Sequence, residues 1–393
     1  MTLAPARPGA GSDGPGSDGP GSDGPDADGP DADGPDADGA GSDGAGGPAS
    51  LRSRCDAELA DFLDRQDPHW PDGAPRGVFD TLRRFVLAGG KRLRPVFCYW
   101  GWRGAGGDDR REIVAAAAAL EIFHAFALIH DDIMDGSDRR RGEPSVHRIF
   151  ADLHTRSAWR GDSGRYGRNA ALLCGDLCAA WADQMFHECG LDAARIRRGY
   201  AVFAGMRTEV IAGQYLDLVS GVGDGSVASA LTVIRMKAAR YTVTRPLQIG
   251  AALAGAGAGL LAAYAAFGDP LGDAFQLRDD VLGVFGDPAV TGKSVLDDLR
   301  EGKSTVMMAL ARNLADRGQA TRLRELFGNP ELDRGGADDL RTIIVDTGAL
   351  EAIEQMIRIR TQEAVTILVD ASLTPETRTE LTALAESVAE RQS

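Results

Sequence analysis

From residue 51 onward, apolar side chains recur at intervals of three and four residues, and this spacing favours helices throughout. The clearest case runs from Ile113 to Asp135, IVAAAAALEIFHAFALIHDDIMD, without a proline or a glycine. Alternating runs rich in β-branched residues, which would indicate strands, are nearly absent. The sequence therefore predicts an all-α fold, in which about 345 residues form one large helical domain.

The first 48 residues differ in kind from the rest. Between Gly11 and Ala45 the chain repeats pentads such as GSDGP and DADGP, without large apolar side chains. Such a segment cannot bury enough apolar surface to offset the entropy that is lost on ordering. The period of five excludes a collagen-like fibre, which requires a period of three. We expect residues 1–48 to be a disordered acidic tail and residues 49–393 to be the folded domain.

Charge and cysteine content restrict the class of protein. The net charge is −15, of which the tail's ten aspartates and one arginine supply about −9. The remaining chain is mildly acidic without a basic stripe, which argues against nucleic-acid binding. The five cysteines are scattered and form no CxxC pair, so neither a disulfide framework nor a zinc site is favoured. Because no apolar signal sequence precedes the repeats, we expect a reduced, cytoplasmic protein.

One segment, from Leu247 to Gly268, is long enough to span a bilayer. It consists mostly of alanine and glycine, is interrupted by Gly255, Gly257 and Gly259, and leads directly into charged sequence. Two buried helices with a glycine break explain it better, so we expect no transmembrane segment.

Three aspartates, Asp131, Asp132 and Asp135, end the long apolar helix predicted above. Residues four apart lie one turn above each other, so Asp131 and Asp135 share a face with Asp132 beside them. Like charges at this spacing repel unless a cation lies between them. Mg²⁺, which prefers oxygen ligands, is the natural cation. The alternative is a helix end neutralised by the arginines that follow.

A second acidic pair, Asp279 and Asp280, follows another largely apolar run. Either pair alone is more often an ordinary charge cluster at a helix end. Two such pairs, each closing an apolar run and each followed by lysine or arginine, favour a shared functional site.

The basic residues have a pattern of their own. In GGKRLRP, Lys91 and Arg94 are one turn apart after two glycines, which suits an anion site where a loop enters a helix. The other candidate cations are Arg140, Arg141, Lys237, Lys293 and Lys303. Lys293 lies in TGKS, but a P-loop needs a glycine at the position of Asp287 and a preceding strand. Metal ions and cations around one cleft indicate a diphosphate, and the apolar helices indicate that its other end is hydrocarbon.

In this order, the motifs resemble those of the trans-isoprenyl diphosphate synthases, in the polyprenyl synthetase family, over essentially residues 50–393. The matching segments are GGKRLRP, EIFHAFALIHDDIMD, RRGEPSVH, LLCGDL, AGQYLDL, MKAARYT, AFQLRDDVLG, GDPAVTGKS and DDLREGKST. The resemblance implies an isoprenoid-synthase-type helical bundle around a central cavity, with the two acidic motifs facing each other across it. It also implies a homodimer.

The resemblance also assigns roles to single residues. The implied metal ligands are Asp131, Asp135 and Asp279, for about three Mg²⁺ ions in total. Asp132 and Asp280 would support them, and with Lys237 these aspartates would be the catalytic residues. Positions that contact the allylic substrate or its diphosphate correspond to Arg140, Lys237, Gln276, Lys293 and Lys303. The isopentenyl diphosphate pocket corresponds to Lys91, Arg94, His124 and Arg141.

The implied reaction is an Mg²⁺-dependent condensation of isopentenyl diphosphate with dimethylallyl, geranyl or farnesyl diphosphate. Metal and cationic side chains stabilise the departing diphosphate, and the isopentenyl double bond attacks the allylic cation. His124 has a simpler alternative role as a core histidine. A terpene cyclase is a second alternative, but it needs no isopentenyl pocket. A non-catalytic partner subunit is a third, but it would be expected to lose one acidic motif.

Three features depart from the family pattern. Gly283 stands where many relatives have a third aspartate in the second motif, so a metal there would depend on Asp279 and Asp280. Ala238 follows Lys237 where threonine is common, which removes a hydroxyl contact. We expect residues 152–169 to form a longer surface loop than usual.

Product length in this family depends on the side chains upstream of the first motif. Phe126 is five residues before Asp131, and five residues of helix rise about 7.5 Å. A ring at that depth should stop a short-to-medium chain, and the small Ala127 leaves additional room. We expect geranylgeranyl diphosphate (C20) as the product, with farnesyl diphosphate (C15) as the alternative.

Overall fold

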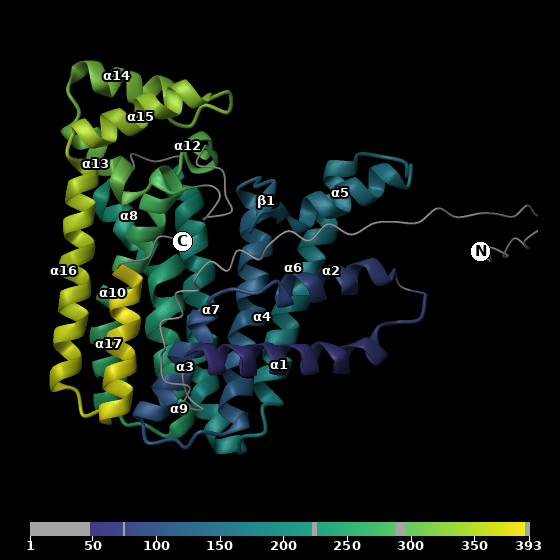
Figure 1. Ribbon diagram of the computed structural model, residues 1–393. Coiled ribbons are helices and arrows are strands. Elements are labelled where there is room, and N and C mark those ends of the chain that lie inside the picture. The colour runs from purple at the N-terminus through teal and green to yellow at the C-terminus, as the bar shows by residue number, and fades with distance from the viewer. Residues whose placement is uncertain (1–47, 74, 222–225, 288–295, 390–393) are drawn as a thin grey trace, which may run out of the picture. The chain divides into compact units, whose positions relative to one another are not determined.

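Helices make up most of the described chain, which confirms the all-α prediction (Figure 1). The computed structural model describes residues 48–389, except residues 74, 222–225 and 288–295. The predicted disordered tail lies outside the described residues apart from Pro48, where the first helix begins. The chain divides into two units, Met1–Ser42 and Asp43–Ser393, and the helical domain belongs to the second.

The first half of this unit contains long helices and one short hairpin. Its elements are α1 (Pro48–Gln66), η1 (Asp67–His69), α2 (Arg76–Leu87), α3 (Leu93–Gly104), α4 (Arg111–Met134), β1 (Arg139–Arg140), β2 (Glu143–Pro144), α5 (Val146–Arg156), α6 (Ser163–His187) and α7 (Ala193–Gly221). The two-residue strands β1 and β2 pair in antiparallel orientation, and the arginines of the first motif lie at this turn.

The second half is also helical. Its elements are α8 (Val227–Val233), η2 (Ile234–Thr244), α9 (Arg245–Ala254), α10 (Ala258–Phe285), α12 (Asp297–Glu301), α13 (Val306–Leu314), α14 (Arg317–Leu326), α15 (Arg334–Asp346), α16 (Ala349–Asp370) and α17 (Pro375–Ala389). The helix from α8 to α9 is continuous, and its middle part, η2, is a π-helix.

The helices that carry the acidic motifs are packed into the core. α4 packs against α6, α1 and α3, whereas α10 packs against η2 and α16. In Figure 1, α14 and α15 lie at the end of the bundle where α16 begins. Buried side chains form two clusters, one mainly in α1–α7 and α9, and one in the C-terminal half. α4 is long and apolar enough to cross a membrane, but most of that apolar stretch is buried, as in the core helix of a folded domain.

The glycine break expected after Leu247 is present. α9 ends at Ala254, Gly255 adopts a left-handed conformation with φ of 93°, and α10 begins at Ala258. A positive φ costs glycine little because it has no Cβ. The apolar segment therefore consists of two helices with a glycine break, as predicted. α9 is buried, whereas the first turns of α10 are partly exposed.

The prediction of a long surface loop at residues 152–169 is wrong. α5 continues to Arg156 and α6 begins at Ser163, so the connection is short. The Asp162 side chain caps α6 by accepting a 2.6 Å hydrogen bond from the backbone N–H of Arg165. Gly164 and Gly167 lie within the first turns of α6, and Gly161 lies in the short connection.

Candidate active site

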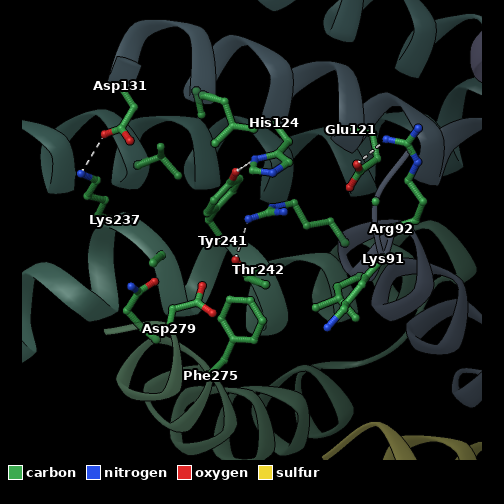
Figure 2. Close-up of a pocket in the computed structure, with 18 of the residues that line it drawn as sticks. Lys91, Arg92, Glu121, His124, Asp131, Lys237, Tyr241, Thr242, Phe275 and Asp279 are labelled. Atoms are coloured by element: carbon green, nitrogen blue, oxygen red, sulfur yellow. Dashed lines mark hydrogen bonds and ion pairs between the residues drawn. The ribbon is translucent and has the colours of Figure 1, made fainter. Parts of the chain in front are cut away.

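A cavity of about 810 Å³ opens between α4, η2, α10 and the start of α3. The predicted site residues that line it are Lys91, Arg94, His124, Ala127, Asp131, Arg140, Arg141, Lys237, Gln276 and Asp279. Figure 2 shows Asp131 and Asp279 reaching toward it from opposite sides. Residues far apart in the sequence thus meet around one cavity. Lys293 lies outside the described residues.

The three aspartates of the first motif are each paired with a cation. Lys237 Nζ lies 2.9 Å from Asp131 Oδ1, and Lys303 Nζ lies 3.0 Å from Asp135 Oδ2. Arg140 Nε donates to Asp132 Oδ1 at 2.9 Å. Asp132 and Asp135 do not line the cavity. Asp132 pairs with Arg140, which does line it, whereas Lys303, the partner of Asp135, does not. The helix end is neutralised, but by residues from three separate segments.

The charges around Asp131 have a clear electrostatic effect. Burial would raise its pKa, but Lys237, Lys303 and Arg140 together outweigh burial and lower the pKa to about 2. Asp131 is thus held ionised, which is the state required of a metal ligand. Its Oδ1 also accepts a hydrogen bond of 3.3 Å from Gln214.

The second motif places its two aspartates differently. Asp279 lines the cavity, whereas Asp280 is 9% exposed and accepts a 3.0 Å hydrogen bond from Gln276. Burial raises the pKa of Asp280 to about 7, and neighbouring Asp298 and Asp279 act in the same direction. Asp280 therefore belongs to the second motif, but its carboxyl group is buried and does not line the cavity.

Gly283 has a structural explanation that the sequence analysis missed. A Cβ built on Gly283 would overlap Asp298 Oδ2, so the carboxyl group of Asp298 occupies the space of a side chain at position 283. Asp298 Oδ1 is also 3.8 Å from Lys303 Nζ. A carboxylate thus stands beside the second motif, contributed by α12 instead of α10.

The predicted isopentenyl pocket is assembled around Tyr241. The guanidinium of Arg94 lies 4.0 Å from the centre of the Tyr241 ring and donates to Thr242 Oγ1 at 2.9 Å. His124 Nδ1 forms a short hydrogen bond with the Tyr241 hydroxyl, marked in Figure 2. Burial lowers the pKa of His124 well below its usual value, and the charges of Arg94 and Arg141 add to this effect. His124 is therefore neutral, and the positive charge of this pocket comes from arginines and Lys91.

The loop that presents Lys91 and Arg94 is anchored by Arg92, which the sequence analysis left unassigned. Arg92 is 3% exposed and has a left-handed φ of 49°. Its guanidinium donates to Glu121 Oε2 at 3.0 Å and to Asp56 at 2.8 Å. Arg92 itself also lines the cavity, and its two ion pairs fix the loop from which Lys91 and Arg94 reach it.

Further functional candidates lie in segments that the sequence analysis quoted without assigning roles. Gln214 and Asp217 belong to AGQYLDL, and Tyr241 and Thr242 belong to MKAARYT. Asp217 Oδ2 lies 2.6 Å from the nitrogen of Lys237. The sequence signal that could have identified these four residues was their position inside segments that match the family pattern. Ala238 lines the cavity without a hydroxyl group.

The two chain-length candidates differ in position. Ala127 lines the cavity, whereas Phe126 is absent from its lining. The ring of Phe126 packs between those of Phe123, at a centroid distance of 5.2 Å, and His130, at 4.8 Å. Phe123 in turn contacts Phe203, so aromatic rings close the space beside the cavity.

The arrangement of the carboxylates suits Mg²⁺ better than it suits a metal ion that is bound by protein side chains alone. Within the described part of the chain, no three His, Cys, Asp or Glu side chains converge closely enough to hold a metal ion by themselves. Mg²⁺ usually binds through one or two carboxylates, several waters and substrate phosphates, so separated carboxylates suit it. Asp280 Oδ2 is buried without a hydrogen-bond partner, which leaves an acceptor at the second motif.

Known proteins resemble this chain over most of its length. Residues 77–344 match the model of the family Polyprenyl synthetase. A geranylfarnesyl diphosphate synthase of Aeropyrum pernix is 35% identical over 291 residues, covering 72% of this chain and 84% of that one. A (2E,6E)-farnesyl diphosphate synthase of Mycobacterium bovis is 30% identical over 259 residues, covering 63% and 65%. The crystal structure of a geranylgeranyl pyrophosphate synthase from Corynebacterium glutamicum, complexed with isoprenyl diphosphate and magnesium, is 40% identical, with a TM-score of 0.85 and coverage of 88% and 99%.

A helical bundle with two acidic motifs across a cation-lined cavity defines the class of prenyl diphosphate synthases. The chain belongs to the polyprenyl synthetase family. It is a short-chain trans-prenyl diphosphate synthase, and hence a prenyltransferase. The names of its relatives span several product lengths.

Proposed function

We propose that this protein condenses isopentenyl diphosphate with an allylic diphosphate in a Mg²⁺-dependent reaction and releases geranylgeranyl diphosphate. The observation that carries the proposal is the placement of Asp131 and Asp279 on opposite sides of one cavity whose remaining wall is rich in cations. Two diphosphates need this much positive charge, and one apolar chain needs the space between the helices.

The cations nearest the first motif hold the diphosphate that leaves. Lys237, Lys303 and Arg140 are positioned by the aspartates and present N–H groups around them. Asp131, Asp135 and Asp279 would hold the magnesium ions, about three in number, whose bound charge lowers the energy of the departing diphosphate. Asp298 would supply the carboxylate that Gly283 lacks. Charge neutralisation here favours breaking the allylic carbon–oxygen bond.

The other substrate is held on the far side of the cavity. Lys91, Arg94 and Arg141 bind the isopentenyl diphosphate, and the neutral His124 contributes a hydrogen bond without adding charge. The double bond forms the new carbon–carbon bond with the allylic cation, and the released pyrophosphate accepts the proton that is lost. No protein nucleophile is needed in this reaction.

The product length follows from the aromatic rings beside the cavity. Ala127 leaves room next to the first motif, whereas Phe126, Phe123 and Phe203 fill the space behind it. We expect Phe126→Ala to lengthen the main product by at least one isoprene unit, because it removes one ring from the aromatic group beside the cavity. Product sizing of wild type and variant checks this. An identical product would contradict the role of Phe126, and a C15 wild-type product would favour the farnesyl alternative.

We also propose that the protein is a cytoplasmic homodimer. All five cysteines are unpaired and buried, as suits a reducing compartment. Exposed apolar side chains gather on α6 and α7, namely Leu172, Leu173, Ile211, Tyr215 and Leu218. Such a face is more often an interface than open surface. Cell fractionation tests the compartment.

The decisive experiment for the activity is incubation with Mg²⁺, labelled isopentenyl diphosphate and each of the three allylic primers, followed by product sizing. We expect a C20 product that disappears when a chelator is added. Asp131→Asn is the matched inactive variant, with kcat lower by about 10²–10³-fold. If no primer gives condensation, the proposed function is wrong.

A further inference from the structure

The π-helix η2 lies unusually close to α10, at two glycines four residues apart. A Cβ on Gly272 would lie 2.7 Å from the carbonyl oxygen of Ala239, and one on Gly268 would lie 2.8 Å from Thr244 Cα. Both positions therefore require glycine. The contacted residues of η2, Ala239 and Thr244, are five apart, although the glycines that face them are four apart.

Two ion pairs repeat the same mismatch. Arg235 Nη2 lies 3.0 Å from Asp273 Oδ2, and Arg240 Nη2 lies 3.2 Å from Asp269 Oδ2. The arginines are five apart on η2, and the aspartates are four apart on α10. Asp269 also accepts a 2.8 Å hydrogen bond from Thr244 Oγ1. Each turn of α10 thus meets one turn of η2 that contains an additional residue.

An α-helix at η2 would not satisfy these contacts. Each residue of an α-helix turns about 100°, so residues five apart point about 140° away from each other. In a π-helix the hydrogen bonds run between residues five apart, and such residues share a face. The backbone N–H of Arg245 bonds to the carbonyl oxygen of Arg240, which is a π-type bond. Pro246, with no N–H and a ring that crowds the carbonyl four residues back, locally favours this arrangement.

The opposite face of η2 belongs to the active-site cavity. Lys237 and Thr242 are also five apart, and both line it together with Tyr241. Lys237 pairs with Asp131, and Thr242 accepts from Arg94, so these two residues connect η2 to both halves of the site. In an α-helix one of the two would turn away from the cavity.

We propose that Asp269 and Asp273 of α10 are positioning residues. Their ion pairs with Arg240 and Arg235 hold η2 in the π register, and this register directs Lys237 and Thr242 together into the cavity. The aspartates lie at a separate surface pocket of about 400 Å³ on the other side of η2 and touch no substrate. The inference concerns the same site as the proposed function and rests on it only for the substrates used in the test.

The test compares two substitutions that remove similar interactions. Asp269 accepts from an arginine and a hydroxyl group, and its side chain is 32% exposed. Asp183 on α6 also accepts from an arginine (Arg207, 2.7 Å) and a hydroxyl group (Tyr200, 2.9 Å), is 35% exposed, and belongs to the α6–α7 pair instead of η2. Asp183→Asn therefore controls for the loss of a similar ion pair.

We expect Asp269→Asn to raise the KM for isopentenyl diphosphate and the Kd for Mg²⁺ with inorganic pyrophosphate about tenfold, the effect of losing one hydrogen bond to a charged group. Asp183→Asn should lower Tm about as much as Asp269→Asn does, but it should change neither the KM nor the Kd. Calorimetric titration with pyrophosphate gives the Kd without turnover. Equal KM and Kd values in the two variants would overturn the inference.

A second substitution tests the register without changing charge. Gly272→Ala places a methyl group against the Ala239 carbonyl and should raise the same two constants in any fraction that folds. If folded Gly272→Ala keeps both constants at wild-type values, close packing does not set the register. Failure of wild type to condense substrates would instead contradict the proposed function, since the pyrophosphate titration stands by itself.

Discussion

At the scale of single residues, His124 is a buried histidine kept neutral by its surroundings. Burial and the charges of Arg94 and Arg141 hold its pKa well below the ordinary value of 6.5. Below that pH the unfolded chain takes up a proton at His124 and the folded chain does not, so the folded state loses stability as the pH falls. The folded state is therefore less stable at pH 5.5 than at pH 7.5.

We therefore expect His124→Gln to lose less stability than wild type between pH 7.5 and pH 5.5. Urea unfolding at both pH values measures the difference. His187→Gln is the control, because the His187 side chain is 46% exposed. If the stability of His124→Gln depended on pH as strongly as that of wild type, the neutral imidazole of His124 would not be the cause of the stability loss at low pH.

Gly283 is the residue at which restoring the family pattern should do harm. In Gly283→Asp the new side chain displaces the Asp298 carboxyl group, which fills this space. We expect Mg²⁺ affinity in the presence of pyrophosphate to fall about ten- to hundredfold, as for other lost supporting groups at metal sites. Calorimetric titration measures it, and Gly283→Asp with Asp298→Ala should recover most of the affinity. If the Gly283→Asp variant alone bound Mg²⁺ with the affinity of wild type, Asp298 would not contribute to the metal site.

At the scale of elements, the start of α3 depends on a buried ion pair. Arg92 and Glu121 are 3% and 5% exposed, and their side chains are 3.0 Å apart. Removing the charge of Glu121 leaves the buried guanidinium of Arg92 with the partly exposed Asp56 as its remaining carboxylate partner, so the cost lies at the low end of the about 3–5 kcal/mol for breaking a buried ion pair. We expect Glu121→Gln to lower the free energy of unfolding by this amount in chemical denaturation. Arg110 and Glu112, an exposed pair, provide the control: Glu112→Gln should cost less than about 1 kcal/mol.

Most helices and the break at Gly255 were predictable because they depend on nearby residues, although the early start of α6 at Ser163 was missed. The apolar period located α4 and α10, and Gly255 located the break before α10. The π register of η2 was not predictable, since VASALTVIRMKAARYTV has an ordinary helical pattern and the register depends on α10. Asp298 was missed for the same reason, because its relation to Gly283 exists only in the fold. The acidic motifs could be found because their residues cluster in the sequence as well as in space.

At the scale of the whole molecule, the exposed apolar face of α6 and α7 is the surface at which we propose that two chains associate. Leu173 and Tyr215 are 69% and 67% exposed. We expect Leu173→Arg with Tyr215→Arg to convert the proposed dimer into a monomer of 41.4 kDa, because arginines on both copies would repel and remain hydrated. Sedimentation equilibrium measures the mass. Val345→Arg on α15, 51% exposed, should leave the dimer intact.

The cavity indicates what such a monomer should still do. α4, η2 and α10, which carry much of its lining, pack against other helices of the same chain. The monomeric variant should therefore bind Mg²⁺ and pyrophosphate as tightly as wild type, even if it is less stable. Loss of pyrophosphate binding on dissociation would mean that a second chain completes the site. If the wild-type protein sedimented as a monomer, the proposed dimer would be wrong, and the apolar face of α6 and α7 would have to bind a different partner.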